Sequence, residues 1–81
     1  MENRLALIAV IVENMESAKK INDILHENAA CIVGRMGVPY REKNVSVISV
    51  MIDAPERVTG AIAGKIGMLE GVSAKTVYAK V

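Results

Sequence analysis

Runs of apolar residues predict four strands. Residues 5–12 are apolar at every position and residues 45–52 at most positions, which is typical of central strands with both faces covered. Residues 30–36 form a shorter run that contains a glycine, and residues 72–81 form a run interrupted by lysines. Glycine and lysine are typical of strands at the edge of a sheet. The sequence therefore predicts two central strands and two edge strands.

After the first predicted strand, the spacing of apolar residues changes to three and four, which predicts an amphipathic helix ending near Asn28. Asn14 stands where the N-cap of this helix is expected, because its side chain can accept a hydrogen bond from a free backbone N–H. The residues expected on the buried face of this helix are Met15, Ala18, Ile21, Leu25 and Ala29.

A second helix is predicted after the third strand. Asp53 and Glu56 have the spacing of a capping box, with Pro55 in the first turn. Gly71 is expected to end the helix, since glycine readily adopts the left-handed conformation that follows many helices. The residues expected on the buried face are Val58, Ile62, Ile66 and Leu69.

The predicted order of elements is βαββαβ, which favours one α+β domain over residues 1–81: a ferredoxin-like sandwich with a four-stranded antiparallel sheet. The first and third strands usually lie in the middle of this sheet. Two helices can cover only one sheet face. The other face would then expose Val45, Val47 and Met51, together with alternate residues of the first strand. This predicts a homodimer or tetramer, formed across the open sheet face or by pairing of edge strands.

Charge and composition reduce the number of function classes that this chain can belong to. The 81 residues carry a net charge of +1, and the sequence pI of about 7.9 lies below the range of a typical nucleic-acid binder, so no direct nucleic-acid contact is expected. Residues 5–12 are too few to span a bilayer, so no membrane contact is expected. Cys31 is the single cysteine, which excludes an intrachain disulfide and favours the cytoplasm.

Residues 34–42 are predicted to connect the second and third strands, and they contain the residues best suited to binding a ligand. Arg35 and Arg41 carry planar guanidinium groups that suit carboxylates and other anions, and Tyr40 adds a polar aromatic side chain. These three residues are the candidate ligand-binding residues. The alternative interpretation is an extended hairpin at the sheet edge with solvated charges.

Gly60, Gly64 and Gly67 are spaced by four and three residues, so they form a glycine stripe along the second predicted helix, opposite its buried face. A glycine costs about 1 kcal/mol relative to alanine within a helix. One interpretation is an interface where another subunit or partner approaches closely. The alternatives are a bare helix face in solvent, or close passage of the first helix.

His26 and Cys31 are the only soft metal ligands in the chain. A zinc or nickel site usually needs three or four ligands, so a single chain is not expected to form one, and no metal or cofactor is predicted. A metal site shared between subunits is the alternative. No nucleophile, base and orienting group can be assembled from the sequence, so an enzyme is not expected.

Several segments resemble the iron-only hydrogenase system regulator family. They are Gly-Arg-Met-Gly-Val-Pro-Tyr-Arg-Glu at 34–42, the strand at 48–53, Gly-Lys-Ile-Gly at 64–67 and Glu-Gly-Val at 70–72. The resemblance implies a fold related to ACT domains and to the ligand-binding domain of nickel-responsive regulators. It also implies a regulatory role, which is inferred for the family from its occurrence with hydrogenase maturation proteins. It assigns no site residues.

Three functions are therefore expected as alternatives, and the last of them is a metal-binding protein that uses His26 and Cys31 across subunits. The first is a regulatory module that binds a small anionic ligand or a protein of the hydrogenase system. The second is a non-catalytic adaptor between proteins in hydrogenase maturation, using the glycine stripe and the open sheet face.

Overall fold

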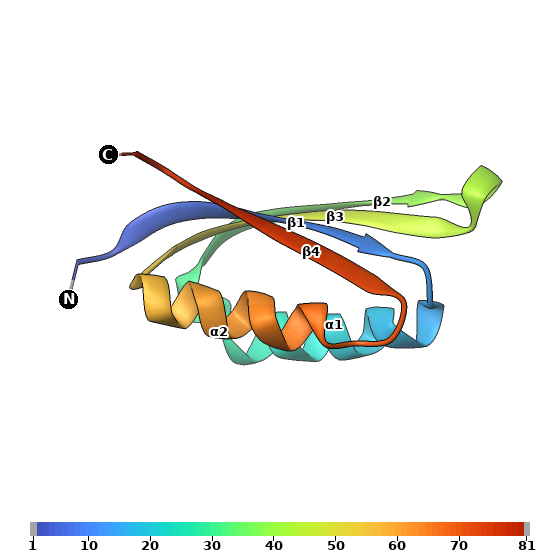
Figure 1. Ribbon diagram of the computed structural model, residues 1–81, viewed down its shortest axis with the longest axis horizontal. Coiled ribbons are helices and arrows are strands. Elements are labelled where there is room, and N and C mark those ends of the chain that lie inside the picture. The colour runs from blue at the N-terminus through green and yellow to red at the C-terminus, as the bar shows by residue number, and fades with distance from the viewer. Residues whose placement is uncertain (1, 81) are drawn as a thin grey trace.

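The computed structural model describes residues 2–80 and has the predicted βαββαβ order (Figure 1). Its strands form one antiparallel sheet with the order β2-β3-β1-β4, so the fold is the expected ferredoxin-like sandwich. Short 3₁₀ turns follow α1, at Ala29–Cys31, and β2, at Arg41–Lys43. The helices and strands are β1 (Arg4–Val12), α1 (Met15–Glu27), β2 (Ile32–Tyr40), β3 (Val45–Ala54), α2 (Glu56–Gly67) and β4 (Val72–Tyr78).

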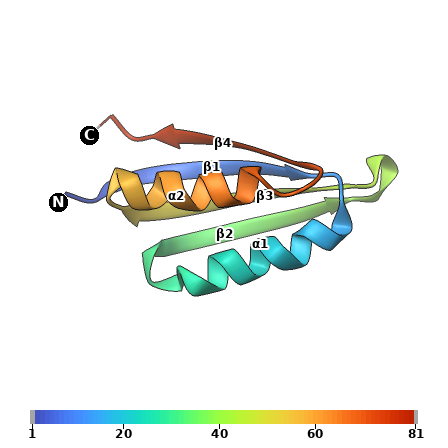
Figure 2. The ribbon, with the colours of Figure 1, turned by 60° about the horizontal axis from the view of Figure 1, so that its bottom comes forward.

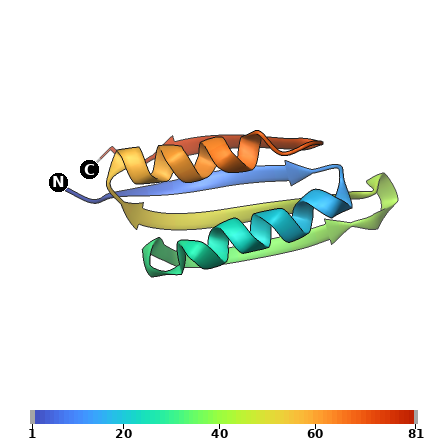
Figure 3. The same ribbon diagram turned by 90° about the horizontal axis from the view of Figure 1, so that it is seen from below.

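Both helices cover the same face of the sheet (Figure 1), with α1 over the β2–β3 side and α2 over the β1–β4 side (Figure 3). The central positions of β1 and β3 are confirmed. Every second residue of β1, from Ala6 to Val12, is buried against the helices, whereas the residues between them are exposed. The expectation that both faces of β1 are covered is therefore wrong within one chain.

Apolar spacing identified the centre of each helix correctly. Ile21 and Leu25 of α1 and Ile62 and Ile66 of α2 are fully buried in the core. The ends were less predictable, since Met15 is 52% exposed although it was expected inside. The remaining expected residues lie at the margin: Ala18, Val58 and Leu69 are half-buried and pack against the core, and Ala29 is exposed.

The N-cap of α1 was predicted correctly, and the N-cap of α2 was not. Asn14 caps α1, because its Oδ1 accepts a hydrogen bond from the Glu16 N–H at 3.0 Å. Asp53 does not cap α2. It remains in β3, opposite Leu5 of β1, and Pro55 occupies the N-cap position without a side-chain hydrogen bond. Pairing of the strand backbone therefore extends into the expected capping box, as far as Ala54.

The predicted connection at 34–42 is also wrong in extent. Residues 34–40 belong to β2 and pair with β3 from Met51 to Val45, leaving a turn of residues 41–44. Asn44 closes this turn in the left-handed conformation, with φ of 54°. An edge strand tolerates the glycines and proline of β2, because one side of its backbone needs no partner strand. The edge positions of β2 and β4 are confirmed. Of the last predicted strand, Val81 lies outside the described residues.

Gly71 does not end α2 directly. The helix stops at Gly67, and Gly71 lies in the turn before β4 with φ of 69°. Its carbonyl accepts a hydrogen bond from the Glu13 N–H at 2.7 Å. Ser17 of α1 donates a hydrogen bond from its Oγ to the Glu70 carbonyl, also at 2.7 Å. These contacts join the start of α1 to the turn that leads into β4.

Candidate functional site

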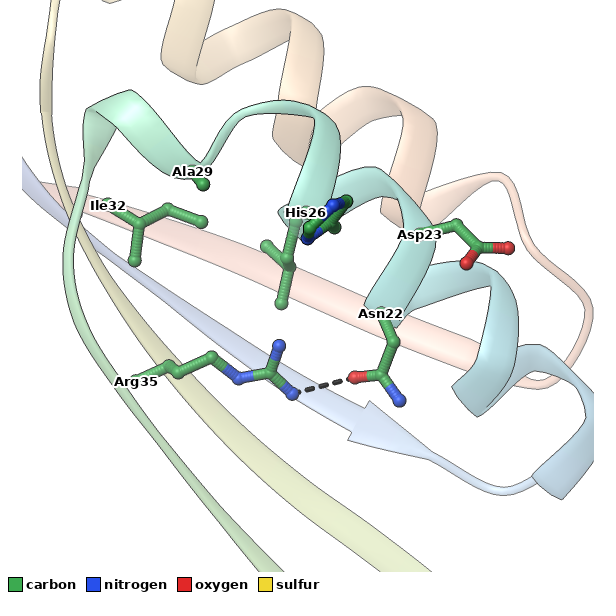
Figure 4. Close-up of a pocket in the computed structure, with 7 residues that line it drawn as sticks. Asn22, Asp23, His26, Ala29, Ile32 and Arg35 are labelled. Atoms are coloured by element: carbon green, nitrogen blue, oxygen red, sulfur yellow. Dashed lines mark hydrogen bonds between the residues drawn. The ribbon is translucent and has the colours of Figure 1, made fainter.

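An open depression of about 490 Å³ lies between α1 and the start of β2. α1 runs beside β2 along this side of the molecule (Figure 2). The depression combines an apolar floor with amide, imidazole, carboxylate and guanidinium groups (Figure 4). Its lining residues are Asn22, Asp23, Leu25, His26, Ala29, Ile32 and Arg35.

Arg35 reaches this depression because of its register in β2. It pairs with Val50, a buried residue on the helix-covered face, so its side chain lies on the same face, toward α1. Its Nη2 donates a hydrogen bond to Asn22 Oδ1 at 2.7 Å (Figure 4). Within residues 2–80, no carboxylate forms an ion pair with Arg35. The guanidinium is thus oriented by a neutral partner and has no ion-pair partner among the described residues.

Tyr40 and Arg41 do not line the depression that contains Arg35. Tyr40 pairs with Val45 on the face away from the helices, and its hydroxyl is 3.2 Å from Glu42 Oε2, to which it donates a hydrogen bond. With Arg41 it lines a separate depression of about 210 Å³ near the β2–β3 turn. Arg35 and Tyr40 are five residues apart, and side chains an odd number apart along a strand point to opposite faces. One chain therefore does not unite the three predicted ligand-binding residues in one site.

The sheet face without helices carries a broad apolar surface. Val47 and Met51 are 40% and 41% exposed there and Val45 is partly exposed, as expected for this face. The exposed large apolar residues on this face, which we call the open-face patch, are Leu5, Leu7, Ile11, Met36, Val38, Tyr40, Val47, Met51 and Val77.

A notch interrupts the open-face patch at Gly34. This residue pairs with Met51, and no atom lies within 4 Å of the position that a Cβ would occupy. Leu7, Met36 and Met51 contribute to the walls of the resulting depression, which measures about 270 Å³. The patch is thus an uneven apolar surface with a central hollow.

Gly60 and Gly64 of the glycine stripe face open space, whereas Gly67 lies against β4 and not opposite the buried face of the helix as expected. No atom lies within 4 Å of the Cβ positions of Gly60 and Gly64, and at Gly67 the nearest is the Ala74 Cβ at 4.0 Å. Close passage of α1 along the stripe, one of the three interpretations, is therefore wrong. Whether a partner docks there stays a prediction.

Within the part of the chain that the structure describes, His26 and Cys31 do not belong to a metal-binding cluster. His26 is exposed at the edge of the Arg35 depression, and Cys31 is a half-buried free thiol against the core. Across residues 2–80, no three His, Cys, Asp or Glu side chains are close enough to hold a metal ion. In the same part of the chain, no helix has the length and apolar character needed to cross a membrane.

Residues 4–76 match the model of a protein family, TM1266-like, described as "Iron-only hydrogenase system regulator, putative". The chain belongs to this family. A solved structure described as the uncharacterized protein TM1266 from Thermotoga maritima is 31% identical. The similarity covers 98% of this chain and 100% of that one, with a TM-score of 0.93. A comparison with curated proteins finds no match.

More distant structures resemble this TM1266-like chain in fold alone. The C-terminal domain of MgtC from Mycobacterium tuberculosis is 7% identical, with a TM-score of 0.76 over 98% of this chain and 90% of that one. A formyltetrahydrofolate deformylase from Pseudomonas putida KT2440 is 11% identical, with a TM-score of 0.66 over 90% of this chain but 28% of the enzyme. In both of these proteins a domain of this shape is one part of a larger protein.

Sequence reasoning missed Asn22, the residue that orients Arg35 in this TM1266-like structure. A signal was present, since Asn22 and His26 are four residues apart and lie on the same side of α1. The missing information was the position of α1 relative to β2. Arg4 was also overlooked: it pairs with Glu56 and lies over the ring of Tyr78, with Cζ 5.2 Å from the ring centroid.

Proposed function

We propose that this chain is a non-catalytic regulatory module of an iron-only hydrogenase system, and that it binds a small carboxylate-bearing ligand in the Arg35 depression. The observation that supports this proposal is the environment of Arg35. Its guanidinium is exposed, is oriented by Asn22 from the neighbouring helix, and has no carboxylate partner within residues 2–80. A guanidinium held in this way can bind a carboxylate through two parallel hydrogen bonds.

The surroundings of Arg35 favour recognition of an anionic ligand that also has an apolar part. Ala29 and Ile32 offer apolar contact, while His26 supplies an imidazole ring at the edge of the depression. Asp23, at the rim, would repel a ligand carrying a second negative charge near it and so adds selectivity. The family description supports regulation rather than catalysis. The cytoplasm is the compartment that agrees with a single free thiol.

Ligand binding can be tested by thermal unfolding against a panel of amino acids, small dicarboxylates and nucleotides, because a ligand that binds only the native state raises the melting temperature. A hit is then measured by calorimetry with the unmodified chain and Arg35→Lys. Lysine keeps the charge but lacks the bidentate fork, so affinity should fall about tenfold or more.

Arg57→Lys is the matched control, since Arg57 is an exposed arginine on α2 and does not line the depression. It should leave affinity unchanged. Arg41→Lys tests the separate depression near the β2–β3 turn. A ligand whose affinity falls with Arg41→Lys but not with Arg35→Lys would refute the assignment of the site.

The second candidate function is an adaptor in hydrogenase maturation. The observation that favours it is the open space over Gly60 and Gly64, which lets another backbone approach α2 closely. No response to any compound in the panel, together with loss of a hydrogenase-system partner on Gly64→Leu, would favour the adaptor.

A further inference from the structure

Nearly all the exposed large apolar side chains of this chain lie on one surface. Of the twelve within the described residues, nine belong to the open-face patch, and the exceptions are Met15, Val33 and Met68. The strand register alone places the nine on the same side of the sheet. This concentration is a property of the surface as a whole and does not involve the Arg35 depression.

The area of the patch can be compared with known interfaces. From the exposed fractions, its nine residues, backbone atoms included, present about 900 Å² to solvent, whereas the largest apolar patch on a typical monomer is about 300–600 Å². A standard protein–protein interface buries about 800 Å² on each partner. The patch therefore has the area that one complete interface requires.

The chemistry of the patch indicates the kind of partner. At the strand positions of this face only Asp53 and Lys75 are charged, and both are marginal: Asp53 is near the end of β3 and Lys75 is on the edge strand β4. Homodimer interfaces are more apolar than the interfaces of transient complexes, and their centres are depleted of charge. A face with no charge at its centre needs no partner of opposite charge, so a second copy can pack on it without repulsion between like charges.

We propose that a second copy of this chain packs on the open-face patch, sheet against sheet, giving a four-layer α/β/β/α dimer. Met51 and Leu7 lie at the centre of the contact, beside the notch at Gly34, which can accept an apolar side chain of the other copy. The dimer adds to the proposed regulatory function and does not depend on it.

The sheet edges argue against the alternative, pairing of edge strands between copies. β2 has an irregularity between Ile32 and Gly34, and Pro39 has no N–H to offer to a further strand. β4 carries Lys75, and a lysine is a common safeguard against edge pairing. The edges therefore have features that discourage pairing, whereas the open-face patch has none at its centre.

Sedimentation velocity on the full chain over about 1–100 μM tests the proposal, and we expect a dimer. Met51→Lys places a charge at the centre of the contact and should raise the dimer dissociation constant by about 30-fold or more, as for an interface hot spot. Met36→Lys should act in the same direction. Met36 is 65% exposed on an edge strand, so lysine is tolerated there by the fold.

Met68→Lys is the matched control, because Met68 is 87% exposed and lies after α2, away from the sheet face. Val33→Lys tests the β2 edge, where Val33 is 61% exposed. Both should leave the dissociation constant unchanged. Far-UV circular dichroism establishes whether each variant is folded. If Met51→Lys unfolds the chain, the dissociation constant of the Met36→Lys variant decides whether the open-face patch forms the dimer.

Three results would overturn the proposal. The first is a monomer throughout the concentration range. The second is a dimer that folded Met36→Lys leaves intact. The third is a dimer that Val33→Lys dissociates while the open-face variants do not, which would assign the contact to the β2 edge.

Discussion

Gly71→Ala should destabilise the fold strongly. Gly71 has φ of 69°, and a Cβ at this position would lie 2.8 Å from Asn14 Cβ and 3.0 Å from Asn14 N. The left-handed conformation costs a non-glycine residue about 1–2 kcal/mol, and an overpacked methyl group typically costs about 1–3 kcal/mol. Asn14 cannot move away freely, because it caps α1 while the neighbouring Glu13 N–H binds the Gly71 carbonyl. The free energy of unfolding should fall by about 2–5 kcal/mol. Native proteins at the low end of the usual range have a total stability of roughly 5 kcal/mol, so this loss is large.

Urea unfolding followed by far-UV circular dichroism measures this change, with the slope m used to check that the unfolding transition is comparable. Unmodified and variant chains must be compared at one protein concentration, since self-association would make stability depend on concentration. Gly64→Ala is the control for adding a methyl group to a glycine without these contacts. A change of less than about 0.5 kcal/mol for Gly71→Ala, within the range usual for harmless surface substitutions, would refute the reasoning.

Four other changes can be measured in the same unfolding assay. Gly64→Ala should stabilise the chain by about 1 kcal/mol through helix propensity, because no atom opposes the new methyl group; destabilisation would indicate a partner on the stripe. Thr59→Val should stabilise by about 1 kcal/mol, since the buried Thr59 Oγ1 has no hydrogen-bond partner among the described residues; an unchanged midpoint would indicate a bound water. Ser17→Ala should cost about 1–2 kcal/mol by leaving the Glu70 carbonyl unpaired, and no loss would mean that water replaces the hydroxyl. Asn14→Ala should cost about 1 kcal/mol as a lost N-cap, whereas Asn14→Asp, which keeps the acceptor, should be nearly neutral.

The fold was predictable because its signals are periodic. Apolar runs identified the two central strands, one of them apolar at every position, and spacings of three and four identified Ile21, Leu25, Ile62 and Ile66 as buried. The helix spacings and every second residue of the strands reflect burial between the sheet and the helices, while the remaining apolar residues of β1 lie on the open face. The open sheet face followed from counting layers, since two helices cannot cover both sides of four strands.

The errors arose where long-range backbone pairing outweighed a local signal. Asp53 and Glu56 match a capping box, yet Asp53 pairs with Leu5 because β3 continues along β1. The glycines and proline of 34–42 suggested a loop, yet they occupy an edge strand that pairs with β3. The three predicted ligand-binding residues lie in two separate depressions for the same reason. In a loop, Arg35 and Tyr40 could converge, whereas in a strand they point to opposite faces.

β2 carries both proposed surfaces on consecutive residues. Arg35 lies on the helix-covered face, toward Asn22, and Met36 lies on the open face, opposite Ser49. A substitution at one residue therefore changes one surface while the other keeps its own side chains. Arg35→Lys should weaken ligand binding without dissociating the dimer, and Met36→Lys should do the reverse. If each variant instead altered both properties, β2 would couple them, and the ligand would have to change dimer affinity by the same factor as the dimer changes ligand affinity.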